Sequence, residues 1–170
     1  QLGYVPHGAA RALARQRADT IGAIFPAIDN LPFATAAKAI QDRLDPHGYT
    51  LLLASSADED ARELAQLRSL MTRGLDGVIL VGEARCDDVY HLLATKAVPY
   101  VNTWTYNPDS SHPTLGFDNA EAARAVAQYL IDIGHSRIGM IAGPLARNDR
   151  VAARIEGVRT GLAANGLSLP

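Results

Sequence analysis

Three residues in this chain have side chains suited to binding a hydroxylated or anionic small molecule. Asp118 can accept hydrogen bonds from hydroxyl groups, and Arg154 can donate a planar fork to hydroxyls or to a carboxylate. Trp104, the only tryptophan, offers a flat face against which a sugar ring can lie. Together these residue types point to the recognition of a small polar ligand.

Each of these residues also has a purely structural interpretation. Asp118 can cap a helix that begins near Asn119, since Asp and Asn are favoured at that position. Trp104 can be a core or interface residue. Arg154 can be a surface cation near a helix start, where positive charge is unfavourable. That last point favours a function for Arg154, because a guanidinium in the first helical turn needs an anionic or hydroxylated partner.

The elements that must position these residues follow from the hydrophobic pattern. Short apolar runs alternate with helical patterns and predict strands over 20–25, 49–54, 77–81, 99–103 and 137–142. Amphipathic spacing predicts five helices, with apolar positions within 33–44, 64–71, 89–93, 122–130 and 155–162. The strands are continuous apolar runs, which is typical of a parallel sheet covered on both faces. We therefore predict a doubly wound α/β fold.

A doubly wound sheet binds its ligand in the crevice beyond the carboxyl ends of its strands. By this rule one predicted cleft is bordered by 26–33, Gly82-Glu83, Trp104-Thr105, Asp118 and 143–154. The polar stretch 105–114 follows a predicted strand and is expected to be a surface loop or a short strand connection.

Length and charge restrict the partners. A chain of 170 residues suits one domain, or one domain and part of another. Residues 1–17 hold three of the 16 basic residues and none of the 18 acidic ones, so the remainder carries 13 basic against 18 acidic side chains. A core of that sign does not bind nucleic acid non-specifically, so any affinity for DNA must come from the N-terminal end or from a segment outside this chain.

The N-terminal residues combine an extended turn, Gly3-Tyr4-Val5-Pro6, with a short alanine-rich helix over 9–15. Two or three turns are too few for a helix that is stable alone in water. The helix is basic and carries a single leucine, Leu13, so it is suited to ordering on a polyanion. Leu13 can act as a wedge between base pairs in the minor groove, or it can pack on its own domain or on a partner helix.

Several function classes lack their usual signals. Cys86 is the only cysteine, and the five histidines share no metal-binding spacing with it. The chain has no Gly-rich phosphate loop and no nucleophile elbow, so we expect no cofactor, no metal and no enzymatic activity. No apolar run approaches membrane-spanning length, and no secretory signal is present, so a cytoplasmic location without membrane contact is expected.

A set of short motifs gives the chain a family resemblance. The run from Gly3 through Ala10-Arg11-Ala12-Leu13 to Thr20-Ile21-Gly22 resembles the hinge helix and first core strand of lactose-repressor (LacI/GalR) family transcription regulators. The later motifs follow in the family's order and spacing: Phe117-Asp118-Asn119, Gly134-His135, Ile138-Gly139, Gly143-Pro144 and Arg154-Ile155-Glu156-Gly157. No single motif is decisive, but together they form a specific signal.

The resemblance implies a periplasmic-binding-protein-like fold of two lobes. It predicts a hinge helix and linker over 1–17, an N-terminal lobe over 18–134 and the start of a C-terminal lobe over 135–170, which leaves the second lobe incomplete. It implies effector contacts from Phe33, Trp104, Asp118, Asn148, Asp149 and Arg154, and DNA contacts from Ala10, Arg11, Leu13 and Arg15. The implied partners are a sugar or sugar acid, operator DNA, a helix-turn-helix head outside this chain, and a second copy in a homodimer.

The predicted function is therefore that of a ligand-responsive transcription regulator, expected to be a repressor. A periplasmic-type solute-binding receptor shares the two-lobe architecture but would lack the basic hinge helix. An α/β sugar-processing enzyme is a third possibility that only the fold class supports, since no catalytic set is present.

Overall fold

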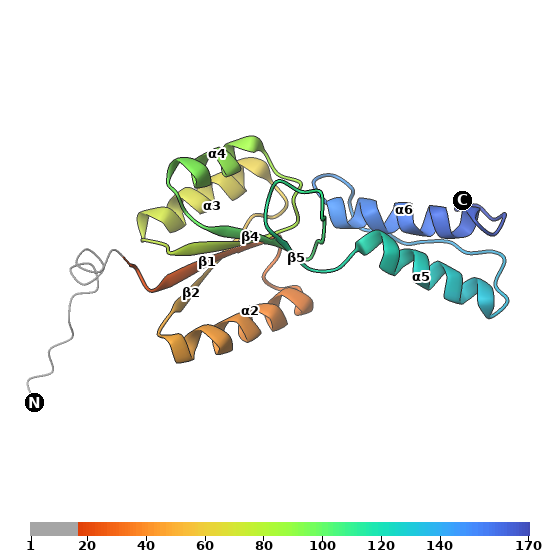
Figure 1. Cartoon of the computed structure of the whole chain (residues 1–170), viewed down its shortest axis with the longest axis horizontal. Coiled ribbons are helices and arrows are strands. Elements are labelled where there is room, and N and C mark those ends of the chain that lie inside the picture. Colours follow the sequence, from red (N-terminus) through yellow and green to blue (C-terminus); the bar gives the residue numbers. More distant parts are fainter. Residues whose placement is uncertain (1–16) are drawn as a thin grey trace, which may run out of the picture. The chain divides into compact units, whose positions relative to one another are not determined.

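The structure of this protein is a computed structural model that describes residues 17–170 (Figure 1). The described chain divides into two compact units. The first comprises residues 17–80 and Cys86–Tyr100, and the second comprises Val81–Arg85 and Val101–Pro170. Within the described residues, no helix is both long and apolar enough to cross a bilayer.

The strands are β1 (Thr20–Phe25), β2 (Thr50–Ser55), β3 (Gly77–Val81), β4 (Tyr100–Thr103) and β5 (Thr114–Leu115). They form one sheet with the order β2-β1-β3-β4-β5. β1 pairs in parallel with both β2 and β3, and β4 pairs in parallel with β5. The sequence predictions of the first four strands and of a parallel, doubly wound sheet are confirmed, with strand ends displaced by at most one residue.

The helices of the first unit are α2 (Leu31–Leu44), α3 (Asp60–Thr72) and α4 (Asp87–Thr95). Figure 1 shows α2 on one face of the sheet and α3 with α4 on the other. α2 has proline in its first turn, where no backbone N–H is needed, and a short 3₁₀ turn over Asp45–His47 follows it. Gly48 then adopts φ 75°, the left-handed conformation that a helix end commonly requires.

Both faces of β1 and β3 are covered, which explains why these strands are apolar without alternation. The main core cluster contains residues from β1, β2 and β3 together with α3 and α4: Ile24, Ala54, Leu67, Leu70, Val78, Leu80, Val89 and Leu93. Leu67, Leu80 and Leu93 are fully buried.

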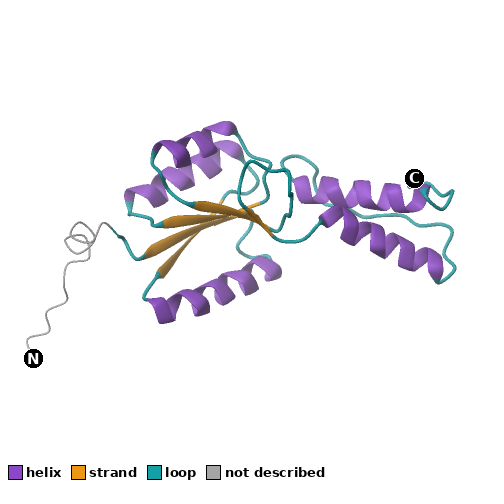
Figure 2. Cartoon of the chain, viewed as in Figure 1, coloured by secondary structure: helices purple, strands orange, loops and turns teal. Residues whose placement is uncertain are grey.

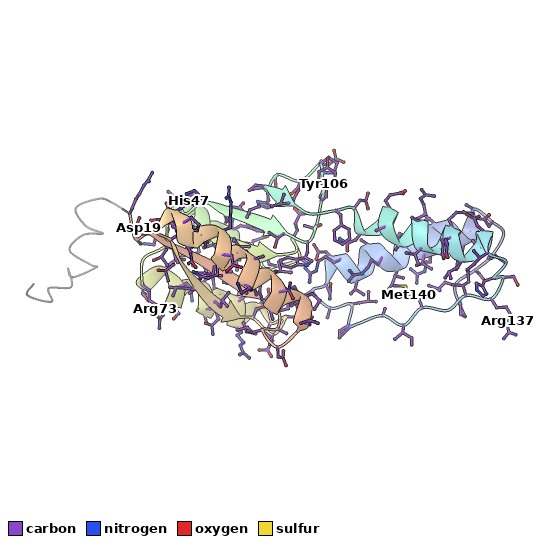
Figure 3. The ribbon with its side chains drawn as sticks, turned by 90° about the horizontal axis from the view of Figure 1, so that it is seen from below. Asp19, His47, Arg73, Tyr106, Arg137 and Met140 are labelled. Carbon is purple, nitrogen blue, oxygen red and sulfur yellow. The ribbon has the colours of Figure 1, made fainter. Side chains whose placement is uncertain are left out.

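A side chain near the start of β3 anchors the beginning of the described chain. The two carboxylate oxygens of Asp76 accept hydrogen bonds from the backbone N–H groups of Ala18, at 2.8 Å, and Asp19, at 2.9 Å. The backbone N–H of Asp76 donates in turn to the carbonyl of Thr20. Asp19 is labelled in Figure 3 where the described chain begins.

The second unit is organised around α5 (Asn119–Asp132) and α6 (Asp149–Ala163), which pack along one another. Their shared core contains Ala123, Ala127, Val158 and Leu162, with Ile138 and Met140 packed against it. In Figure 3, Met140 lies beside the helices whereas Arg137 points away from them.

The predicted strand over 137–142 is wrong. These residues form no strand, and Figure 2 draws the whole segment between α5 and α6 as loop. A parallel strand needs hydrogen bonds from a neighbour, and no strand of the described chain pairs with this segment. The expected lobe boundary near residue 134 lies between two helices that pack together in one unit, and it stays a prediction about the complete family fold.

Candidate functional site

The predicted ligand-binding residues of the second unit lie at the end of β4 and at the starts of α5 and α6. Trp104 follows β4 directly, is half-buried, and has φ 60°. The left-handed conformation is costly for a residue with a side chain, by about 1–2 kcal/mol. The carbonyl oxygen of Trp104 accepts a hydrogen bond from Asn119 Nδ2 at 2.9 Å. The turn that carries the tryptophan is therefore held by the first residue of α5.

Gly116 allows this turn to close. A Cβ at residue 116 would lie 2.6 Å from the backbone nitrogen of Thr105 and 2.9 Å from the carbonyl carbon of Trp104. Any larger residue would push the backbone at 104–105 away, because those atoms cannot move independently of the chain. The position of Trp104 therefore depends on a glycine twelve residues later.

Asp118 is the N-cap of α5. Its Oδ1 accepts hydrogen bonds from the backbone N–H groups of Ala120 and Glu121, both at 2.9 Å. This confirms the capping interpretation of Asp118. The side chain is exposed, and its effector contact stays a prediction.

Asn148 and Asp149 hold the start of α6. Asn148 caps the helix, with Oδ1 accepting from the backbone N–H of Val151 at 3.2 Å. Asp149 Oδ2 accepts from the backbone N–H of Glu83 at 2.7 Å, and Asp149 Oδ1 accepts from Arg150 Nη1 at 3.1 Å. Both side chains therefore have structural partners, although each was predicted as an effector contact.

Arg150 completes this junction and needs a glycine beside it. Its side chain is only 8% exposed and pairs with Asp149. A Cβ at Gly82, where φ is 73°, would lie 1.8 Å from Arg150 Nη1. The guanidinium of Arg150 thus occupies the space where a side chain at residue 82 would begin, and the positive φ would strain any larger residue there.

Arg154 lies one turn later than the sequence predicted. α6 begins at Asp149, so Arg154 is in the second helical turn, where the unfavourable interaction with the helix dipole is weaker. The expectation of a first-turn guanidinium is corrected accordingly. Arg154 Nη1 donates to Asn119 Oδ1 at 3.1 Å, and the side chain is half-buried. In the part of the chain that the structure describes, its partner is thus a neutral amide rather than a carboxylate.

A close helix contact brings these two residues together. A Cβ at Gly157 would lie 2.0 Å from the carbonyl oxygen of Ala120, so α6 approaches α5 at a distance that only glycine permits. Three residues earlier on α6, Arg154 lies on the same side and reaches Asn119. The glycine of the Arg-Ile-Glu-Gly motif thus has a defined packing role.

Phe33 belongs to the first unit. It is half-buried in the first turn of α2, and its ring stacks on that of Phe25 with centroids 5.5 Å apart and an interplanar angle of 18°. This contact joins α2 to the end of β1. The remaining predicted residues, Ala10, Arg11, Leu13 and Arg15, lie outside the described residues.

Asn119 is the site residue that the sequence did not identify. It is only 4% exposed and links the backbone of Trp104 to the side chain of Arg154. Its local signals were its position beside a predicted cap and its place in the Phe117-Asp118-Asn119 motif, but its contacts with Trp104 and Arg154 span 15 and 35 residues. Arg150 was likewise included only as part of the range 143–154.

One exposed ion pair near the start of α5 shifts the pKa values of its two members. A hydrogen bond from Arg124 lowers the pKa of Glu121, and the same contact raises the pKa of Arg124, but this pair is fully exposed. Among residues 17–170, no group of three His, Cys, Asp or Glu side chains gathers as a metal site requires. The chemistry available here is hydrogen bonding by the guanidinium of Arg154 and the amide of Asn119.

Comparison with known proteins decides the family. Residues 18–170 match the model described as "Periplasmic binding proteins and sugar binding domain of LacI family". The chain belongs to this family. Catabolite control protein A of Streptococcus mutans is 30% identical over 168 residues, which cover 98% of this chain and 50% of that protein.

Two solved structures resemble the fold closely. Transcription regulator GntR from Chromobacterium violaceum matches 87% of this chain and 54% of its own, with TM-score 0.82 and 28% identity. A periplasmic binding protein/LacI transcriptional regulator from Alkaliphilus metalliredigens, complexed with D-xylulofuranose, matches 89% of this chain and 55% of its own, with TM-score 0.77 and 28% identity. The chain spans about half the length of the relatives it matches.

Proposed function

We propose that this chain is part of a ligand-responsive, DNA-binding transcription regulator whose core binds a small sugar or sugar acid. One observation carries the proposal. The similarity to catabolite control protein A covers 98% of the chain, so it extends ahead of residue 18, where the sugar-binding family match begins. A solute-binding receptor needs no counterpart of the basic segment before that residue.

The effector contacts proposed in the second unit are Trp104, Asp118, Asn148, Asp149 and Arg154, and Phe33 is proposed from the first unit. Arg154 is the strongest of these, because a half-buried guanidinium with an amide partner retains donors for hydroxyl or carboxylate oxygens. Trp104 supplies an apolar face for a sugar ring. Asn148 and Asp149 fix the helix start from which Arg154 projects.

The DNA contacts are proposed for the N-terminal segment. Leu13 enters the minor groove between base pairs, while Arg11 and Arg15 meet phosphates and Ala10 allows close approach. In a homodimer, the effector favours one arrangement of the lobes and so sets the separation of the paired hinge segments. The coupling is reciprocal, so an effector that weakens DNA binding is bound less tightly by the DNA-bound form. Such a regulator acts as a repressor in the cytoplasm and performs no catalysis.

The DNA arm of the proposal is tested with Leu13→Ala in the intact protein. We expect weaker binding to a duplex from the upstream region of its own gene in a gel-shift assay, a smaller bend by FRET, and unchanged sugar affinity. Leu31→Ala is the matched control, since Leu31 is 77% exposed on α2. If the Leu13 variant bends the duplex as much as the wild type does, Leu13 does not insert between base pairs. If the wild-type protein does not bind duplex DNA, the proposed regulator function is wrong.

The effector arm is tested with Arg154→Ala against D-xylulose and D-gluconate by calorimetry. The loss of a donor to a buried polar partner should weaken binding by about 1–3 kcal/mol. Arg159→Ala is the control, since Arg159 lies on the same helix but is exposed and pairs with Glu156. Wild-type affinity in the Arg154 variant would exclude this residue from the site, and turnover of either sugar would favour an enzyme.

A further inference from the structure

Asn119 is a buried amide that hydrogen-bonds to two proposed effector residues and to one neighbouring carbonyl. Its Nδ2 donates to the carbonyl oxygens of Trp104, at 2.9 Å, and Phe117, at 3.3 Å. Its Oδ1 accepts from Arg154 Nη1 at 3.1 Å. One side chain therefore connects the end of β4 with the second turn of α6.

Contacts made by neighbouring residues, rather than by Asn119 itself, place this amide between Trp104 and Arg154. The close approach at Gly157 brings α6 onto the first turn of α5, and the cap by Asp118 fixes where α5 begins. Gly116 keeps the turn at residues 104–105 within reach of Asn119. The three backbone constraints leave Asn119 between the tryptophan turn and the guanidinium.

An asparagine suits this position better than an aspartate. Both residues can accept from Arg154, but only the amide can also donate to the two carbonyl oxygens. A carboxylate would face those carbonyls without a proton to share. It would also neutralise the guanidinium, whereas the amide orients Arg154 and leaves its positive charge available to a ligand.

We infer that Asn119 is a positioning residue of the effector site, which sets Trp104 and Arg154 in a fixed relation without contacting the effector itself. This inference rests on the proposed function. The preference for an uncharged or an acidic sugar then depends on residue 119. A neutral residue there leaves the charge of Arg154 available to a ligand, whereas an acidic residue would pair with it.

The test compares Asn119→Ala and Asn119→Asp with the wild type in the intact protein. Asn165→Ala is the matched control, since Asn165 Nδ2 donates to Gln128 and Gly161 at the far end of the same unit. Emission of Trp104 is isolated by subtracting the spectrum of a Trp104→Phe variant, and its accessibility is measured by acrylamide quenching without any sugar. Circular dichroism melts identify variants that fail to fold.

Both Asn119 variants should change the emission and raise the quenching of Trp104, because both lose the donation to its carbonyl. Asn119→Ala should weaken binding of D-xylulose and D-gluconate roughly tenfold or more, the usual result of removing a hydrogen bond to a charged group. Asn119→Asp should weaken D-gluconate binding more than D-xylulose binding, because its carboxylate competes with that of the sugar acid for Arg154.

The inference would be overturned if both Asn119 variants kept the wild-type emission and quenching of Trp104. It would also be overturned if Asn165→Ala changed the emission and raised the quenching as much as the Asn119 variants do. Equal losses for the two sugars in Asn119→Asp would overturn the charge argument. A wild-type protein that binds neither sugar would count against the proposed effector class, while the sugar-free fluorescence would still decide whether Asn119 positions Trp104.

Discussion

In the first unit apolar side chains lie between paired strands and three helices, whereas in the second unit they line a single pair of helices. The first unit buries Leu67, Leu80 and Leu93 completely. In the second unit, Val126 and Tyr129 of α5 and Ile133, the residue after this helix, remain 53–63% exposed. An apolar groove runs along the second unit between α5, α6 and the segment at 138–140.

An apolar run becomes a strand only where another strand lies beside it. The runs at 77–81 and 137–142 are both rich in apolar residues, but only the first becomes a strand. β3 has β1 beside it, with Val78 opposite Gly22, and the backbone groups of both are paired. The segment at 137–142 has no neighbouring strand within the described residues, so Ile138 and Met140 pack on the helix pair while Ile141 is fully exposed.

The largest effect is expected from Leu67→Ala in the core of the first unit. Leu67 is fully buried between α3 and the sheet, so truncation leaves a cavity and should lower the free energy of unfolding by about 2–5 kcal/mol. Urea unfolding of the intact protein measures the change, with the exposed Leu31→Ala as control. A loss no larger than that of the control would contradict the assignment of this cluster as the main core.

A smaller loss is expected from Gly157→Ala in the second unit. The new methyl group would meet the carbonyl of Ala120, and moving two helices apart should lower the free energy of unfolding by about 1–3 kcal/mol. Gly139→Ala is the matched control, because nothing lies within 4 Å of a Cβ at residue 139. If both variants unfold at the same urea concentration, the two helices do not depend on close contact at Gly157.

The smallest effect is expected at Asp118, where it separates capping from ligand binding. Asp118→Ala should lower the free energy of unfolding by about 1 kcal/mol, whereas Asp118→Asn retains a capping oxygen and should cost only a few tenths. Asp132→Ala at the other end of α5 is the control. Weaker D-xylulose binding by the stable Asp118→Asn variant would support the proposed effector contact, and unchanged binding would leave Asp118 as a cap alone.

Local patterns predicted most of the fold. Four strands follow from continuous apolar runs, and the helix ends at Gly48, Gly74 and Gly134 follow from glycine, which adopts positive φ at all three positions. The cap by Asp118 follows from residue type. These features depend on neighbours a few residues away, so a single sequence contains the information for them.

The candidate site was less predictable because its contacts join distant residues. Arg154 meets Asn119 across 35 residues, and Asp149 meets Glu83 across 66 residues. The close approach at Gly157 involves the backbone of Ala120, 37 residues earlier, and could not be predicted from local sequence. Residue types alone could identify candidates for ligand binding, but not the amide that holds two of them in place.

The anchoring of Ala18 and Asp19 by Asp76 has a mechanical consequence. The donors and the acceptor belong to the same compact unit, so the backbone at Ala18 and Asp19 is held in place relative to the start of β3. The two hydrogen bonds restrain residues 18 and 19 from moving independently of the sheet. A rotation of the first unit therefore also rotates the backbone of residues 18 and 19.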